Sequence, residues 1–178
     1  MDSPDRHALE IRVGNGFDVH AFADGRKLWL GGCLIPHSRG LAGHSDADVL
    51  LHVIIDAVLG ALAKGDIGHH FPDIDPSYKD IASEKMFRLV WQEAQADGWR
   101  LGNCDSVVMA QEPRLAQHVP AMCERIAQLF LADVTQVNVK ATTTERLGFV
   151  GRKEGIAASA VVLLQRGFAP TLSGGKTN

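Results

Sequence analysis

The chain has 178 residues, of which 46% are hydrophobic and 22% are charged, and its formal net charge is -3. A chain of this length is expected to form one domain. Its slightly acidic balance provides no basic field that would attract nucleic acid non-specifically. No segment approaches the ~18 consecutive apolar residues of a membrane span, so we expect no membrane partner.

Both ends of the chain are predicted to lie outside the folded domain, which we place at residues 11–168. Residues 1–10 are polar and carry three acidic residues, which is typical of a disordered N-terminal extension and of neither a signal nor a transit peptide. Residues 169–178 resemble a flexible tail. The cysteines are odd in number and widely spaced, which argues against a disulfide framework and favours the cytoplasm: Cys33, Cys104 and Cys123.

Predicted strands and helices alternate along the chain. Hydrophobic alternation predicts strands at Ile11–His20, Cys104–Ala110, Val137–Ala141 and Ile156–Leu164, with short strands around Gly31-Gly32 within Lys27–Pro36. Helices are predicted at about Asp46–Lys64, Asp80–Asp97 and Pro120–Leu131. These elements indicate an α/β or α+β single-domain sandwich, in which a mixed β-sheet packs on helices.

The first predicted helix is apolar on nearly every face, so most of it must be buried. Ser45 is a suitable N-cap for it, with Asp48 three residues further on in capping-box spacing. In the last strand, one face is uniformly apolar: Ile156, Ala158, Ala160, Val162 and Leu164.

Asp18 and His20 are two residues apart in the first strand, so their side chains point to the same side. His52 lies in the apolar helix, where an imidazole is costly to bury without a partner. Together these residues offer three ligands for a divalent metal, and an open fourth position is typical of a catalytic zinc site. Asp56 is a candidate to orient the His52 ring without binding the metal itself.

Two alternatives remain open at this point. Asp18 and His20 are also an ordinary pair for an exposed strand face. Asp48, His52 and Asp56 are spaced as a single helix stripe, which can simply face solvent.

A loop rich in glycine, proline and acidic residues follows this helix, at residues 65–76. Such composition usually marks a solvated turn. Beside a metal ion, its carboxylates can instead accept hydrogen bonds from the hydroxyls of a sugar or polyol. His69 and His70 are interpreted as exposed loop residues.

The segment Ala141–Arg146 (ATTTER) directly follows a predicted strand. Threonine hydroxyls and backbone N–H groups at a strand end suit phosphate oxygens, and Glu145 is a fit ligand for Mg²⁺. The alternative is helix capping by the T-x-x-E pattern. His44-Ser45 before the helix places an imidazole, a hydroxyl and the N-terminal amides of the helix together, which is a possible anion site.

Five segments in order carry a family resemblance: GNGFDVHAF, GHSDADVLLH, GDIGHHFPDIDPSYK, NVKATTTERLGF and GRKEGIAASAVVLL. They resemble the 2-C-methyl-D-erythritol 2,4-cyclodiphosphate synthase family of the non-mevalonate isoprenoid (terpenoid) pathway. The resemblance runs from about Ile11 to Leu164. It leaves no room for the cytidylyltransferase domain to which this synthase is fused in some organisms, so the chain is expected to be monofunctional.

The resemblance implies a role for each matching residue. Zn²⁺, one per subunit, would be bound by Asp18, His20 and His52, and Mg²⁺ or Mn²⁺ by Glu145. His44 and Thr143 would stabilise the transition state, and His44 and Ser45 would touch phosphate or polyol. The ribose and erythritol part would be lined by Asp66, Ile67, Gly68, Phe71, Pro72, Asp73, Ile74 and Asp75. The cytidine and phosphate pocket would be formed by Ala110, Gln111, Glu112, Pro113, Arg114, Leu115, Ala116, Thr142, Thr143, Thr144 and Glu145.

The resemblance also implies an assembly and a reaction. A cyclic homotrimer is expected, with Phe149 and Arg152 at a central cavity able to hold an isoprenoid diphosphate. The enzyme, a phosphorus–oxygen lyase, would convert 4-diphosphocytidyl-2-C-methyl-D-erythritol 2-phosphate into the cyclic diphosphate and release CMP. Ala116 is smaller than the residues typical of the family at the edge of the cytosine pocket. The alternatives are a metal-dependent phosphohydrolase and a non-catalytic module that binds a nucleotide or an isoprenoid diphosphate.

Overall fold

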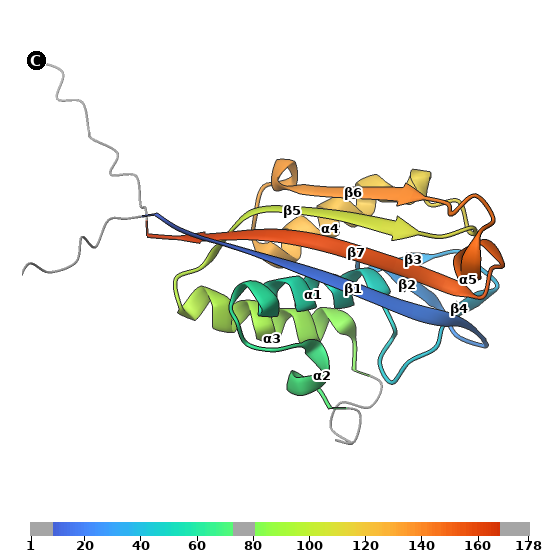
Figure 1. Ribbon diagram of the computed structural model, residues 1–178, viewed down its shortest axis with the longest axis horizontal. Coiled ribbons are helices and arrows are strands. Elements are labelled where there is room, and N and C mark those ends of the chain that lie inside the picture. Colours follow the sequence, from blue (N-terminus) through green and yellow to red (C-terminus); the bar gives the residue numbers. More distant parts are fainter. Residues whose placement is uncertain (1–8, 73–80, 168–178) are drawn as a thin grey trace, which may run out of the picture.

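The computed structural model describes residues 9–72 and 81–167. A five-stranded sheet runs in the order β4-β1-β7-β5-β6 (Figure 1). Its strands are β1 (Glu10–Asp24), β4 (Arg39–Leu41), β5 (Arg100–Met109), β6 (Val137–Thr142) and β7 (Gly155–Arg166). The β5–β6 pair is parallel and the other pairs are antiparallel, so the predicted mixed sheet is confirmed.

The first and last strands form the longest ladder of the sheet. β1 and β7 pair from Glu10↔Arg166 to Ala21↔Gly155. The predicted apolar face of β7 is confirmed, because the side chains from Ile156 to Leu164 on that face are at most 1% exposed. Only one face of the sheet is therefore part of the hydrophobic core.

The helices α1 (Val49–Ala61) and α4 (Val119–Phe130) lie on that core face, and α3 (Ser83–Ala96) packs against both helices. As predicted, α1 is buried along nearly its whole surface. It lies against β1 without intervening side chains, because β1 carries glycine where the helix backbone passes. A Cβ added to Gly14 would lie 1.9 Å from the carbonyl oxygen of Ala57, and one added to Gly16 would lie 2.1 Å from that of Val53.

The predicted N-cap of α1 is wrong. The helix begins at Val49, and its N-cap is Asp48 rather than Ser45. The Asp48 carboxylate accepts the N–H of Leu51 and also the N–H groups of Gly31 and Gly32, at 2.7–3.0 Å. A tertiary contact therefore decides which of the neighbouring polar residues caps the helix.

Gly31 and Gly32 form the turn of the predicted hairpin, which is confirmed as β2 (Leu28–Leu30) and β3 (Cys33–Ile35). Both glycines have positive φ, 60° and 75°. Such a pair suits a two-residue turn whose twist matches the strands, and L side chains rarely adopt it.

Several short elements were not predicted from the sequence. These are β4, α2 (Ile67–His70), α5 (Gly148–Gly151), and the 3-10 turns Ala116–His118 and Val134–Gln136. The predicted helix from Asp80 begins at Ser83 in the described residues. Among the described helices, none combines the length and the apolar character needed to cross a membrane.

The second face of the sheet is open, and its part on β1 and β7 is apolar. Large hydrophobic side chains on it are between 39% and 62% exposed: Ile11, Val13, Phe17, Val19 and Val161. The first four alternate along β1 with the residues that face α1. This set is called the open apolar face below.

Candidate metal centre

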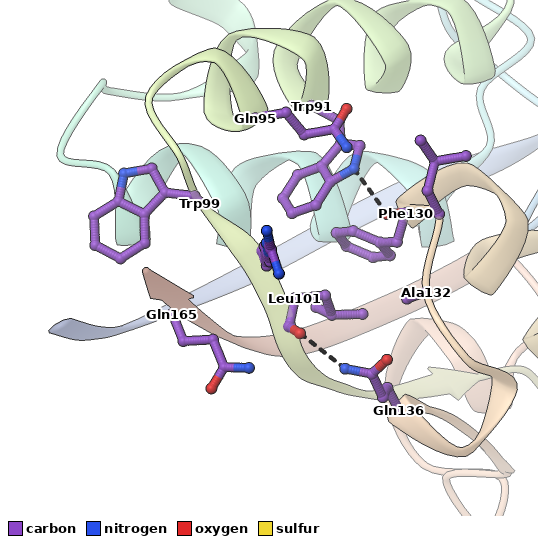
Figure 2. Close-up of a pocket in the computed structure, with 10 residues that line it drawn as sticks. Trp91, Gln95, Trp99, Leu101, Phe130, Ala132, Gln136 and Gln165 are labelled. Atoms are coloured by element: carbon purple, nitrogen blue, oxygen red, sulfur yellow. Dashed lines mark hydrogen bonds between the residues drawn. The ribbon is translucent and has the colours of Figure 1, made fainter. Parts of the chain in front are cut away.

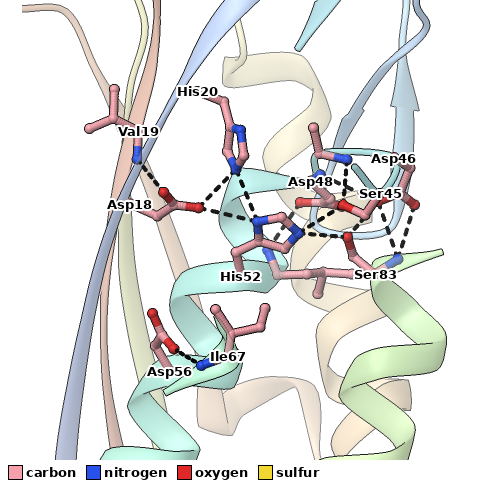
Figure 3. Close-up of polar contacts among 12 residues, drawn as sticks. Asp18, Val19, His20, Ser45, Asp46, Asp48, His52, Asp56, Ile67 and Ser83 are labelled. Atoms are coloured by element: carbon pink, nitrogen blue, oxygen red, sulfur yellow. Dashed lines mark hydrogen bonds and ion pairs between the residues drawn. The ribbon is translucent and has the colours of Figure 1, made fainter. Parts of the chain in front are cut away.

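Asp18, His20 and His52 converge on one point between β1 and α1 (Figure 3). Oδ2 of Asp18 lies 2.9 Å from Nε2 of His20 and 3.1 Å from Nδ1 of His52. The two ring nitrogens are 3.0 Å apart. The three ligands predicted from the sequence are therefore brought together, and the alternative of an unrelated exposed pair is wrong.

The local fold explains this convergence. Asp18 and His20 share one side of β1 because they are two residues apart in a pleated strand. His52 comes from the first turn of α1, which the glycines of β1 allow to approach the strand. The backbone N–H of Val19 donates to Oδ1 of Asp18 at 2.7 Å, which leaves Oδ2 directed at the two imidazoles.

Each histidine is held through its second ring nitrogen. Nδ1 of His20 lies 2.6 Å from the carbonyl oxygen of Ala42 and donates to it, so Nε2 is the ring nitrogen left to face Asp18 and His52. Nε2 of His52 lies 3.0 Å from Oγ of Ser83 and 3.2 Å from Oγ of Ser45. Partners of this kind fix the ring orientation of metal-ligating histidines.

The protonation behaviour of the cluster reflects both burial and close charges. Burial raises the pKa of Asp18, but hydrogen bonds from His20 and His52 outweigh it and hold the pKa well below its ordinary value. Burial lowers the pKa of His20, but the Asp18 carboxylate outweighs it and the pKa is raised. The Asp18 carboxylate therefore stays ionised at neutral pH, as a metal ligand must.

One carboxylate oxygen and two imidazole nitrogens, all within 4.8 Å of one another, can hold a divalent metal ion. Two of the three ligands come from β1 and one comes from α1. This arrangement fits a cation that keeps a position for a further ligand.

The predicted role of Asp56 is wrong. Its carboxylate accepts the backbone N–H of Ile67 at 2.7 Å, and both ring nitrogens of His52 have other neighbours. Burial raises the pKa of Asp56. The stripe of Asp48, His52 and Asp56 does not face solvent, because Asp48 is 0% exposed and His52 is 8% exposed.

His44 and Ser45 lie in the loop before α1. His44 is exposed, whereas Ser45 is buried and its Oγ accepts the N–H of Ala47 at 2.9 Å. Ser45 thus faces His52 and stands beside the metal cluster. Because the helix begins only at Val49, the predicted group of helix amides directly after Ser45 does not form.

The loop after α1 forms a short helix. Asp66 is the N-cap of α2 and accepts the N–H of His69 at 2.8 Å. Ile67 and Gly68 lie in α2, Phe71 is 8% exposed and Pro72 is half-buried.

His70 also lies in α2 and is half-buried, and its Nε2 lies 2.9 Å from the carbonyl oxygen of Lys64. It is therefore not the exposed loop residue we predicted. The predicted residues Asp73, Ile74 and Asp75 lie outside the described residues.

The segments predicted to form the nucleotide pocket meet at one edge of the sheet. β5 and β6 are parallel, so their carboxyl ends lie side by side, and the N–H of Ala110 donates to the carbonyl of Thr142 at 2.9 Å. Oε1 of Gln111 accepts the N–H of Arg146 at 3.2 Å. Pro113 and Arg114 follow in the loop, Leu115 is buried, and Ala116 begins a 3-10 turn.

Glu112 binds basic side chains at this edge. Its Oε2 lies 2.5 Å from Nζ of Lys153, and its Oε1 lies 3.4 Å from the Arg39 guanidinium. The hydrogen bond from Lys153 lowers the pKa of Glu112. This predicted pocket residue is thus half-buried and ionised, and it is bound by Arg39 and Lys153.

The alternative reading of T-x-x-E as a helix cap is wrong. No helix begins at Thr143, since α5 begins at Gly148 with Leu147 as its N-cap. Glu145 has a φ of 50°, and Oγ1 of Thr143 donates to its Oε1 at 2.9 Å. Oγ1 of Thr144 donates to the carbonyl of Leu147 at 2.7 Å, so the segment is a polar turn.

Phe149 and Arg152 lie at α5. Phe149 is 38% exposed, and Arg152 pairs with Glu154 at 2.7 Å. Both side chains are therefore at the surface of the chain, near the start of β7.

A pocket of about 380 Å³ lies at the other end of β5, lined by Trp91, Trp99 and Phe130 among others (Figure 2). Its buried polar groups are satisfied internally. Nε1 of Trp91 donates to the carbonyl of Phe130 at 2.9 Å, and Nε2 of Gln136 donates to that of Leu101 at 2.8 Å. It contains no residue of the metal cluster, so the chemistry is not placed there.

Asp46 and Ser83 are functional candidates that the sequence analysis missed. Ser83 lies at the first position of α3, 31 residues from the His52 that it contacts. No local pattern signals a contact of this range.

Comparison with known proteins assigns the family. Residues 11–165 match the YgbB family. A protein from Halalkalibacterium halodurans named 2-C-methyl-D-erythritol 2,4-cyclodiphosphate synthase is 60% identical over 154 residues, 86% of this chain and 98% of that protein. One of the same name from Lysinibacillus sphaericus is 57% identical over 156 residues, 88% of this chain and 99% of that protein.

Solved structures agree with this assignment. A structure described as IspF from Plasmodium falciparum in complex with CDP has a TM-score of 0.78 at 32% identity, covering 89% of this chain and 97% of that chain. The bifunctional IspDF from Campylobacter jejuni has a TM-score of 0.85 at 45% identity. It covers 89% of this chain, which spans 43% of the length of that bifunctional protein.

Three clustered metal-ligand side chains on a helix-covered mixed sheet thus indicate an enzyme. The chain belongs to the YgbB family. Its curated relatives are 2-C-methyl-D-erythritol 2,4-cyclodiphosphate synthases. At 57–60% identity over nearly their whole length, the chain shares their function, that of a lyase in isoprenoid biosynthesis.

Proposed function

We propose that the substrate is 4-diphosphocytidyl-2-C-methyl-D-erythritol 2-phosphate, which is cyclised with release of CMP. The observation that carries the proposal is the convergence of Asp18, His20 and His52. The 2-phosphate of the substrate attacks the β-phosphorus, a P–O bond forms there, and the bond to CMP breaks. An ionised phosphate needs no strong general base, so the chain has to supply positioning and charge neutralisation.

The metal proposed for the cluster is Zn²⁺, one per chain, because two imidazoles and one carboxylate are a donor set that zinc prefers. When bound, it supplies positive charge that polarises a phosphoryl oxygen. The chain contributes the ionised Asp18 carboxylate, the His20 ring fixed on Ala42, and the His52 ring fixed on Ser83.

Glu145 is proposed to bind Mg²⁺ or Mn²⁺ together with the substrate diphosphate. The hydroxyl of Thr143 already contacts this carboxylate, so both groups can face the same phosphates. His44 and Ser45 are proposed to bind phosphate or polyol, because Ser45 stands beside His52. The loop of Asp66 to Asp75 is proposed to hold the ribose and erythritol part.

The segments Ala110–Ala116 and Thr142–Glu145 are proposed to hold the cytidine diphosphate. They meet at the carboxyl ends of β5 and β6, where backbone N–H groups and threonine hydroxyls gather. The CDP complex of the Plasmodium falciparum relative supports a ligand of this class.

A cyclic homotrimer is proposed as the working form, with sites between neighbouring copies. The open apolar face supports it, because monomeric proteins rarely expose a contiguous patch of this kind. In the described residues, the side-chain hydrogen bonds between Thr143 and Glu145 stay within their own turn and do not reach Asp18, His20 or His52. A neighbouring copy can therefore bring these residues to the cluster. Phe149 and Arg152 are proposed to face an isoprenoid diphosphate at the centre of the trimer.

The test is a mass spectrum of the product formed by purified protein from this substrate and Mg²⁺. The proposal predicts the cyclic diphosphate and CMP in equal amounts. Formation of CMP with the acyclic 2,4-bisphosphate, one water heavier than the cyclic product, would instead identify a hydrolase, and an unchanged substrate would identify a binding module.

A further inference from the structure

The His52 imidazole uses its two ring nitrogens differently. Nδ1 lies inside the metal cluster, 3.1 Å from Oδ2 of Asp18. Nε2 lies on the other side of the ring, 3.0 Å from Oγ of Ser83 (Figure 3). A neutral imidazole carries one N–H and one lone pair. His52 can therefore offer Nδ1 to a metal ion only while its proton is on Nε2.

Ser83 is arranged to accept that proton. Its Oγ donates to Oδ1 of Asp46 at 2.5 Å, so its own hydroxyl proton is committed to a carboxylate. The backbone N–H of Ser83 lies 3.2 Å from both oxygens of Asp46 and holds this carboxylate in place. Ser83 is 0% exposed, so bulk water does not compete for its lone pairs.

We infer that Ser83, oriented by Asp46, is a positioning residue of the metal centre: it accepts the Nε2–H of His52 and so leaves Nδ1 free of its proton when a metal ion binds between Asp18, His20 and His52. This inference rests on the metal site proposed above. In most metal sites a carboxylate or carbonyl receives the second N–H of the ligating histidine directly. Here the Ser83 hydroxyl lies between the Nε2–H of His52 and the Asp46 carboxylate.

Ser45 does not replace Ser83 in this role. Its Oγ is further from Nε2 of His52, at 3.2 Å, and it already accepts the N–H of Ala47. The Ser83 hydroxyl donates its proton to the Asp46 carboxylate, whereas the contacts described for Ser45 Oγ are with Ala47 N–H and His52 Nε2. The orientation of the Ser83 lone pairs is thus the better defined of the two.

Ser83 also has a structural role at the start of α3, through its backbone N–H. A single variant separates this role from the positioning role of its hydroxyl. The N-cap residue of α3, Ala82, makes no side-chain cap bond, and the Asp46 carboxylate takes its place by accepting the N–H of Ser83. Ser83→Ala keeps this N–H and removes only the hydroxyl. Ser106→Ala is the matched control, because Ser106 is 2% exposed and its Oγ donates to the carbonyl of Asn138, remote from the cluster.

The first experiment measures zinc dissociation constants of the full chain by competition with a chromophoric chelator. Ser83→Ala is expected to raise the constant about 10- to 100-fold, the usual effect of losing such a partner. Ser106→Ala is expected to match the wild type, and Ser83→Thr, which keeps the hydroxyl, to restore most of the affinity. A Ser83→Ala protein with wild-type zinc affinity would overturn the inference.

The second experiment observes the proton itself, in zinc-loaded protein with ¹⁵N-labelled histidine. The His52 signal, assigned with His52→Ala, is expected to show a protonated Nε2 whose N–H exchanges faster with water in Ser83→Ala. A wild-type spectrum with a proton-free Nε2 would overturn the inference even if Ser83→Ala failed to fold. If the wild type binds no zinc, the proposed metal centre fails; if it binds zinc and Ser83→Ala equals Ser106→Ala, only the positioning role fails.

Discussion

Gly16 of β1 lies directly against Val53 of α1, so closely that a Cβ on Gly16 would lie 2.1 Å from the Val53 carbonyl oxygen. The strand residue Asp18 and the helix residue His52 stand next to this contact in the chain. The distance between β1 and α1, set by a missing side chain, is therefore also the distance that lets the metal ligands meet.

Gly16→Ala is expected to destabilise the protein by about 1–3 kcal/mol or more, because the helix and strand must separate. It should also weaken zinc binding. Gly60→Ala is the control, because Gly60 lies in α1 and the nearest atom to a new Cβ there is 3.9 Å away. Alanine is more favourable than glycine inside a helix, so Gly60→Ala should stabilise the protein by about 0.5–1 kcal/mol. Urea unfolding of both variants gives the comparison, and equal effects would contradict it.

His52→Ala is expected to lose bound zinc while the fold is retained, because it removes one of three ligands. Elemental analysis of protein purified without a His-tag or chelator measures this, and circular dichroism monitors the fold. His118→Ala is the control, since His118 lies in a 3-10 turn apart from the cluster. Full zinc content in His52→Ala would exclude the proposed centre.

Glu145→Gln is expected to keep zinc and lose Mg²⁺-dependent turnover. The structure places no helix start at this residue, so the melting temperature should stay close to that of the wild type. Rates and melting curves on one preparation separate the two effects. A loss of about 1 kcal/mol in stability with unchanged turnover would instead identify a cap.

Cys104 is expected to be inert in the native protein. Burial raises the pKa of its thiol to about 12. Since the thiolate is the nucleophile, almost none of the reactive form is present at pH 8, and the side chain is 1% exposed. Iodoacetamide followed by peptide mass spectrometry should modify half-buried Cys123 first and Cys104 only after denaturation. Equal rates at the two cysteines under native conditions would contradict the packing described.

Two inactive variants are expected to rescue each other if sites form between copies. His52→Ala disables the metal-binding part of the site, and Thr143→Ala disables the phosphate-binding part. In a mixed cyclic trimer, a site between two different variants can combine the intact His52 of one chain with the intact Thr143 of its neighbour. Random mixing after joint refolding should revive roughly one site in four. Mixed trimers that stay inactive would show that each site is built within one chain.

The sequence predicted the metal ligands because their geometry is local. A pleated strand puts Asp18 and His20 on one side, and an imidazole in an apolar helix requires a partner. The N-cap of α1 was mispredicted because Ser45, Asp46 and Asp48 are all good caps, and the choice depends on a contact with Gly31 and Gly32.

Long-range contacts account for the rest of what was missed. Ser83 meets His52 only because α3 packs beside α1, and Asp56 turns toward Ile67 because α2 folds back onto α1. The short helix α5 escaped prediction because its four residues include two glycines, which disfavour helices.

The position of β7 has a consequence for how the chain reaches this fold. β7 is the last of the described elements in sequence, yet it lies in the middle of the sheet between β1 and β5. During synthesis the sheet therefore lacks its central strand until residue 166 has left the ribosome. Until then, the backbone edges of β1 and β5 that pair with β7 have no partner strand. A stop codon just before Gly155 would remove the middle of the sheet rather than an edge, so nascent and truncated chains alike would present two templates for aggregation.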